Sequence, residues 1–266
     1  MNCKKTSRHS PENTQERLIS ALYDHAAGRA VLKVLTAPWV SKAGGAVLST
    51  KASRVFIKPF VRRAGIPMED FLGAPYESYN DFFCRKIKPE LRPVSMDRSQ
   101  FISPCDSRLT ALPITPEQRF FLKGSTYTLE SLLRDPDYHR YCYVADGEKG
   151  ENVFLPGVLH TVNPIACDHY PIYKENAREY SVLQTEDWGP ILMMEVGALM
   201  VGKIVNHHGA ARVLRGQEKG YFQFGGSTVV LLVGKDRLAL DEKIISNSQQ
   251  GLETRVLYGE TIGTKN

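Results

Sequence analysis

Residues 221–232 read Tyr-Phe-Gln-Phe-Gly-Gly-Ser-Thr-Val-Val-Leu-Leu, and this stretch sets the pattern for the second half of the chain. Two glycines precede a strongly apolar run, which predicts a turn followed by a strand. A turn alone does not require serine as the next residue. Because glycine has no side chain, the peptide can also adopt a strained geometry in which the Ser227 hydroxyl approaches the Gly226 carbonyl. The stretch therefore fits either an ordinary turn or a serine that attacks its own backbone.

Short apolar runs of this kind recur along the chain beyond Phe101, separated by Gly, Asp, Asn and Pro. The clearest examples are 153–155, 191–196, 229–233 and 254–258. Runs of this length between turn residues predict strands of an antiparallel β core. The second half of the chain is therefore expected to be rich in β structure.

The first 95 residues carry helical signals instead. Ser10-Pro11-Glu12 predicts a helix start, and apolar residues follow it at helical spacing. Pro and Gly residues divide the next segment into short helices, and a further helix is expected at 79–85. The expected fold class is α+β, with a helical N-terminal segment at 1–95 packed on an antiparallel β-rich core at 96–266.

Composition and missing motifs exclude several classes of protein. With 42% hydrophobic and 24% charged residues, the 266-residue chain is expected to fold, as one to two domains. No apolar run reaches about 18 residues and no signal-peptide core opens the chain, which predicts neither a membrane span nor secretion. Walker, dinucleotide-binding and zinc motifs are absent, so no metal and no nucleic-acid partner is expected. The cysteines show no C-x-x-C pair and are expected to be free thiols in a reducing cytoplasm: Cys3, Cys84, Cys105, Cys142 and Cys167.

The net charge of +5 comes from one segment. Between His25 and Met68 there are eight basic residues and no acidic one, whereas the other 222 residues carry 26 basic and 29 acidic side chains, a net −3. The segment also contains Trp39, Phe56 and Phe60. Basic and aromatic residues mixed in this way are typical of amphipathic helices that lie on anionic lipid. The alternative is a solvated helical face whose apolar side lies in the core.

Two of the seven histidines stand in strand-like surroundings. His139 lies within Asp-Tyr-His-Arg-Tyr at 137–141, and His160 within Val-Leu-His-Thr-Val at 158–162. Each is either a structural histidine hydrogen-bonded within the sheet or a group that handles protons. His207 and His208 are adjacent, so on a strand they point to opposite faces, which favours surface histidines over joint metal ligands.

Seven ordered blocks of the sequence together resemble the phosphatidylserine decarboxylases, a family that carries a self-made pyruvoyl group. The blocks lie at 82–89 with 92–94, 103–108, 123–129, 137–140, 162–166, 194–198 and 219–228. The Gly-Gly-Ser-Thr form, with Gly-Leu-Glu-Thr and Tyr-Gly-Glu-Thr-Ile-Gly near the C-terminus, resembles the subgroup found in clostridia and their relatives.

The resemblance implies a proenzyme that cuts itself between Gly226 and Ser227. In the family an aspartate, a histidine and the processing serine form a relay, and Asp106 and Ser227 fill two of those places here. The Ser227 hydroxyl attacks the Gly226 carbonyl, and the resulting ester eliminates to dehydroalanine, which hydrolyses to a pyruvoyl group and ammonia. The products are chains 1–226 and 227–266.

The same resemblance implies the activity. The pyruvoyl ketone forms a Schiff base with the amine of phosphatidylserine and receives the electrons released with CO₂, which gives phosphatidylethanolamine. This carboxy-lyase needs no other cofactor. The implied setting is an anionic phospholipid membrane, with a peripheral enzyme on the cytoplasmic face of the cell membrane, and family members suggest a homodimer.

One position departs from the family pattern. Family members usually read Asp-Tyr-His-Arg-Phe-His, and the second histidine is the one assigned to the relay, but Cys142 stands there in this chain. His160 stands where many relatives have an aromatic residue. If strands at 141–144 and 153–161 are neighbours joined by a turn at Asp146-Gly147-Glu148, Cys142 and His160 face each other across the pair. We therefore expect His160 to be the relay base and His139 to act in decarboxylation.

Two alternatives stay open at this point. Some proteins that resemble this family use a pyruvoyl group to decarboxylate free amino acids. A homologue that never cleaves and only binds lipid is the other alternative, and it would explain why the family histidine is absent.

Overall fold

The computed structural model describes residues 25–113, 138–159, 175–198, 203–223 and 228–266. The helix start expected at Ser10, the cleavage site at Gly226 and Ser227, and His160 lie outside the described residues. The flanks of the cleavage site are described on both sides. The arrangement of the elements around it therefore follows from the described parts of the chain.

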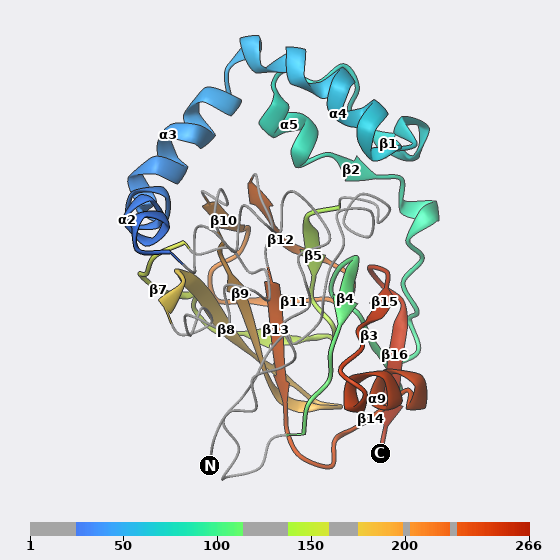
Figure 1. The fold of residues 1–266 in the computed structure, drawn as a ribbon. Helices are drawn as coiled ribbons and strands as arrows, with labels where there is room; N and C mark the ends of the chain where they lie inside the picture. The colour runs from blue at the N-terminus through green and yellow to red at the C-terminus, as the bar shows by residue number, and fades with distance from the viewer. Residues whose placement is uncertain (1–24, 114–137, 160–174, 199–202, 224–227) are drawn as a thin grey trace.

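Short helices dominate the described residues before 95. They are α2 (Ala26–Leu35), α3 (Pro38–Leu48), α4 (Ile57–Ala64) and α5 (Tyr79–Phe83), with 3-10 turns at Lys51–Phe56, Met68–Asp70 and Pro89–Leu91. Pro38 occupies the first turn of α3, where its missing N–H has no helical partner to lose. Gly65 ends α4 in the left-handed conformation, with φ of 63°. These helices form an arc over one end of the β structure (Figure 1).

The β structure consists of several antiparallel sheets. A six-stranded sheet has the order β11-β6-β8-β9-β13, with β7 also paired to β8. Its strands are β6 (Gly147–Lys149), β7 (Val153–Leu155), β8 (Arg178–Thr185), β9 (Gly189–Val196), β11 (Ala211–Val213) and β13 (Thr228–Val233). A three-stranded sheet has the order β10-β12-β5, from β5 (Arg140–Cys142), β10 (Lys203–Asn206) and β12 (Glu218–Gln223).

Smaller sheets complete the molecule. The C-terminal part contributes β14 (Leu238–Leu240), α9 (Glu242–Gln249), β15 (Thr254–Val256) and β16 (Thr261–Lys265). Strands β14, β16 and β3 (Gln100–Ile102) form one sheet, β15 pairs with β4 (Ser107–Leu109), and β1 (Phe71–Leu72) pairs with β2 (Lys86–Ile87). The predicted α+β class is confirmed, and strands occur in all four predicted apolar runs.

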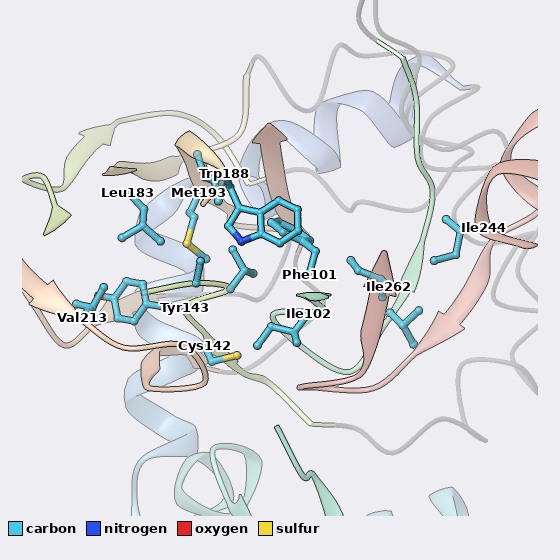
Figure 2. Packing of buried hydrophobic residues seen from close by; sticks show 14 residues of the cluster. Phe101, Ile102, Cys142, Tyr143, Leu183, Trp188, Met193, Val213, Ile244 and Ile262 are labelled. Carbon is cyan, nitrogen blue, oxygen red and sulfur yellow. The ribbon is translucent and has the colours of Figure 1, made fainter. Parts of the chain in front are cut away.

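The largest core cluster lies beneath the β8–β9 hairpin. Trp188, in the turn of that hairpin, is fully buried, and its ring meets Phe101 edge to face with centroids 5.0 Å apart. Figure 2 shows the two rings among aliphatic side chains from β9, β3 and β16. Burying one tryptophan of about 200 Å² contributes on the order of 5 kcal/mol of transfer free energy. The core therefore stabilises the β8–β9 hairpin, and every residue of β13 pairs with β9.

The chain crosses from one sheet to the other at the expected cleavage site. β12 belongs to the three-stranded sheet and β13 to the six-stranded sheet, and residues 224–227 connect them. A buried ion pair joins the same two sheets, because Lys219 of β12 donates to Glu195 of β9 at 2.8 Å with both side chains fully buried.

Two further polar residues extend this ion pair. Asn206 of β10 accepts from Lys219 at 2.8 Å and donates to Glu195 and to Glu179 of β8. We call Glu179, Glu195, Asn206 and Lys219 the intersheet cluster. Glu195 is paired in register with Val229, so the cluster lies beside the first residues of β13.

The intersheet cluster gives a direct test of how the sheets are held together. Replacing Lys219 with Met leaves Glu195 buried without its cation, and we expect the free energy of unfolding to fall by about 3–5 kcal/mol in chemical denaturation. The double change Lys219→Met with Glu195→Leu should recover most of this loss. Lys265→Met is the matched control, because Lys265 pairs with Asp187 at the surface and is worth under about 1 kcal/mol. Equal losses for Lys219→Met and Lys265→Met would contradict this role.

Candidate functional site

Asp106 is held by three hydrogen bonds in a nearly closed site. The Arg92 guanidinium binds both carboxylate oxygens, with Nε donating to Oδ1 at 2.8 Å and Nη2 donating to Oδ2. The backbone N–H of Tyr258 also donates to Oδ1, at 2.7 Å. The Asp106 side chain is 5% exposed and that of Arg92 is 10% exposed. Hydrogen bonding to Asp106 raises the pKa of Arg92, so the guanidinium stays charged.

The loop that carries Asp106 follows β3 directly. Ser103 donates its hydroxyl to the Cys105 carbonyl at 2.9 Å, which fixes the turn between β3 and β4. The Cys142 N–H of β5 donates to the Pro104 carbonyl at 2.9 Å. The Asp106 loop and β5, the strand that follows His139, therefore lie side by side.

His139 lies between the helical segment and β12. Its carbonyl accepts from the N–H of Phe222 at 3.0 Å, and its half-buried ring stacks on Phe83 of α5, with centroids 3.8 Å apart and 14° between the planes. The next residue, Arg140, donates to the Cys84 carbonyl at the end of α5 and to Glu218 of β12. These contacts anchor α5 on the strand that leads to the cleavage site.

One apolar cluster contains sequence neighbours of Asp106, His139 and Ser227. Tyr141, Ala198 and Phe222 form its buried centre, and Cys105 and Val229 pack against it. Cys105 precedes Asp106, and Val229 is two residues after Ser227. The edge-to-face rings of Tyr138 and Tyr258, 6.0 Å apart, connect the residue before His139 with the residue that binds Asp106. The described neighbours of Asp106, His139 and Ser227 therefore meet at one end of the three-stranded sheet.

The thiols in this region are not suited to act as bases. Cys142 is fully buried, and burial raises the pKa of its thiol well above the ordinary value. Burial also raises the pKa of Cys105 to about 12. Both thiols are therefore protonated at neutral pH. Cys84, Cys105 and Cys142 are free, as predicted.

The strand pairing that was expected to place His160 opposite Cys142 is wrong. β5 pairs with β12, whereas β7 pairs with β8 in the other sheet. The stretch expected to be a turn between them contains β6 instead, which pairs with β8. Gly147 packs so closely on β8 that a Cβ there would collide with the Gln184 carbonyl oxygen, so close packing and not a turn requires glycine at this position. Residue 159 lies beside the end of α2, where the Leu159 N–H donates to the Thr36 carbonyl. The position of His160 itself lies outside the described residues.

Three residues of the site were not predicted from the sequence. Arg92 and Tyr258 bind Asp106, and Phe83 stacks on His139. Each lies within a sequence block noted above, but no local pattern indicates its long-range partner. Within the described parts of the chain, no cluster of His, Cys, Asp and Glu side chains could hold a metal ion. None of the described helices is both long enough and apolar enough to span a membrane.

Comparisons with known proteins show which proteins the chain is similar to. Residues 79–264 match the family model described as phosphatidylserine decarboxylase. The chain is 40% identical to phosphatidylserine decarboxylase proenzyme 2 of Clostridium acetobutylicum, with 92% of this chain and 91% of the relative covered. It is 35% identical to a phosphatidylserine decarboxylase proenzyme of Clostridium botulinum (98% and 97% covered) and 34% identical to one of Ruminiclostridium cellulolyticum (98% and 95% covered).

Proposed function

The chain belongs to the phosphatidylserine decarboxylase family, and on this premise we propose how its residues perform the family's pyruvoyl-dependent decarboxylation of phosphatidylserine. The proenzyme cuts itself between Gly226 and Ser227. Asp106 and His160 are the relay partners of Ser227, and His139 acts on the substrate in the decarboxylation step. The product is phosphatidylethanolamine.

The observation that carries this proposal is the convergence of the Asp106 loop and β13 on one apolar cluster. Cys105 and Val229 pack against the same buried centre, Tyr141, Ala198 and Phe222. This packing supports the proposal, because Cys105 is next to Asp106 in the chain and Val229 is two residues from Ser227. The peptide to be cut also joins two different sheets, so cutting it leaves both strands in their own sheets.

The described residues around position 227 fit a pyruvoyl group. Thr228 Oγ1 is buried and has no hydrogen-bond partner among the described residues, so a donor is available one residue from Ser227. A pyruvoyl group derived from Ser227 offers carbonyl oxygens and no donor, which suits such a neighbour. When formed, the group supplies the electron-accepting ketone of the decarboxylation.

The relay needs a base other than Cys142. In the proposed cleavage, a base removes the Ser227 hydroxyl proton, and the Asp106 carboxylate stabilises that base when it becomes charged. Burial keeps the Cys142 thiol protonated, so it cannot take this proton at neutral pH. An imidazole has a suitable pKa, and His160 is the histidine proposed for the task. His139, fixed by Phe83 and the backbone of β12, is left to handle protons or the carboxylate of the substrate.

The substrate assignment is tested with purified protein and two substrate sets. We expect release of phosphatidylethanolamine from phosphatidylserine vesicles and no amine from free amino acids. Ser227→Ala is the matched control, and it should remain one chain and lose all activity. Activity on free amino acids alone would favour the other pyruvoyl enzyme. An uncut wild-type protein that binds vesicles without turnover would favour the lipid-binding homologue.

Substitution of His160 tests the proposed relay base whatever the strand pairing around it. His160→Ala should slow self-cleavage by about 100-fold or more, the range typical of a lost general base, when the uncut chain is followed on gels. Cys142→Ala should have little effect. The double change Cys142→His with His160→Phe, which rebuilds the usual family pattern, should restore cleavage. Wild-type cleavage in His160→Ala, together with loss of cleavage in His139→Ala, would move the base to His139.

The helical arc is proposed to dock the enzyme on anionic membranes. Large apolar side chains remain exposed along it, among them Trp39 at 64%, Val55 at 69% and Phe56 at 55%. Lys58, Arg62 and Arg63 of α4 are exposed as well. Phe60 differs from these, since it packs on Tyr79 and Phe82 of α5. Exposed apolar and basic groups on one segment favour peripheral binding to a membrane, which we propose is the cytoplasmic face of the cell membrane. The homodimer stays a prediction from the family resemblance.

Vesicle sedimentation tests the docking proposal. Changing Lys58, Arg62 and Arg63 to Glu should strongly reduce binding to anionic vesicles, because each basic residue near such a surface contributes about 1 kcal/mol, and salt should weaken wild-type binding. The matched control places the same charge change before β14 and in α9, with Lys235, Arg237 and Lys243 changed to Glu. These segments lie at the opposite end of the molecule from the arc (Figure 1). Equal loss of binding in both triple variants would contradict docking through the arc.

A further inference from the structure

The Asp106 carboxylate has almost no acceptor capacity left. A carboxylate has about four acceptor positions, two on each oxygen. Arg92 Nε and the Tyr258 N–H fill both positions on Oδ1, and Arg92 Nη2 fills one on Oδ2. Among the described residues, the remaining position lies on Oδ2 alone. A further donor, such as an imidazole N–H, therefore has a single place to bind.

The segment that carries Arg92 is itself locked in place. Val94 packs so closely on Gly216 and Gly259 that a Cβ at either glycine would collide with it. Gly259 has φ of 80°, and its N–H donates to the Ser103 carbonyl at 3.0 Å. The turn that presents the Tyr258 N–H therefore holds both the Asp106 loop and the segment of Arg92. This arrangement gives a physical reason for the Arg-Pro-Val and Tyr-Gly-Glu-Thr blocks of the sequence.

We propose that Arg92 is a positioning residue for self-cleavage, which it serves by orienting the Asp106 carboxylate and balancing its charge. The proposal rests on the proposed role of Asp106 in the relay. A planar guanidinium bound to both oxygens fixes the rotation of the carboxylate. The open acceptor position on Oδ2 is therefore held in one orientation. The guanidinium also balances the charge of a carboxylate that is 5% exposed. An Asp106 that is rotated or protonated cannot stabilise an imidazolium.

Two substitutions separate orientation from charge. Arg92→Lys keeps a cation but loses the planar fork, and we expect cleavage about ten-fold slower at neutral pH with an unchanged pH profile. Arg92→Met removes the cation as well and leaves the nearly buried Asp106 carboxylate without its partner. Cleavage should then be about 100-fold slower at neutral pH, and the acidic limb of its pH profile should move to higher pH.

The measurement is the rate at which uncut chain disappears, followed from pH 5 to pH 9 and alongside thermal unfolding. Arg98→Met is the matched control, because Arg98 also binds two carboxylate side chains, Glu186 and Asp187, but at the surface. It should cleave like the wild type. A merely structural Arg92 would lower the melting temperature and leave the acidic limb unmoved. If Arg92→Met does not fold, the rate of Arg92→Lys decides, and a wild-type rate overturns the proposal.

Asp106→Asn separates the proposed role of Arg92 from the proposed role of Asp106. If Asp106→Asn stays uncut while Arg92→Lys and Arg92→Met cleave like the wild type, the role of Arg92 is wrong and the relay stands. If Asp106→Asn cleaves at the wild-type rate, the proposed role of Asp106 fails, and that of Arg92 fails with it. Loss of cleavage in Asp106→Asn, together with the shifted profile in Arg92→Met, supports both.

Discussion

The ion pair between Lys219 and Glu195 joins the two sheets that the chain crosses at the proposed cleavage site. Removing two charges from water costs several kcal/mol for each ion, and the pair offsets this only because Asn206 shares its hydrogen bonds. Its structural effect is to hold β12 against β9, and β9 carries β13. The end of β12 and the start of β13 are thereby kept at the same end of the molecule.

This arrangement accounts for how the two chains expected from the proposed cleavage would stay together. The fragment 227–266 contains β13, β14, α9, β15 and β16. Three of its strands pair with strands of the larger chain, namely β13 with β9, β15 with β4 and β16 with β3. The Tyr258 N–H adds a hydrogen bond to Asp106 across the same boundary. Cutting one peptide bond therefore leaves the interactions that position the new chain end unchanged.

The sequence was informative where local pattern decides structure. Apolar runs between turn residues predicted the strands, and a proline break was predicted at Pro38, where α3 begins. The family resemblance, not residue type alone, brought Asp106 and His139 forward as site candidates, and the structure places the Asp106 loop beside β5. The contacts of Arg92 and Tyr258 with Asp106 could not be predicted, since Tyr258 is 152 residues away in the chain. The prediction of a hairpin turn around residue 147 was wrong. Gly147 begins β6, and its close packing on the Gln184 backbone, not a turn, requires a residue without a side chain there.

The central claim is that Ser227 becomes the pyruvoyl end of a second chain, and an intact-mass spectrum of the purified protein tests it most directly. The account predicts two chains, 1–226 and 227–266. The smaller should be about 17 Da lighter than the same 40 residues with an N-terminal serine, because the serine nitrogen leaves as ammonia. A single uncut chain of 29.8 kDa after long incubation at neutral pH, or a small chain with an intact N-terminal serine, would contradict it.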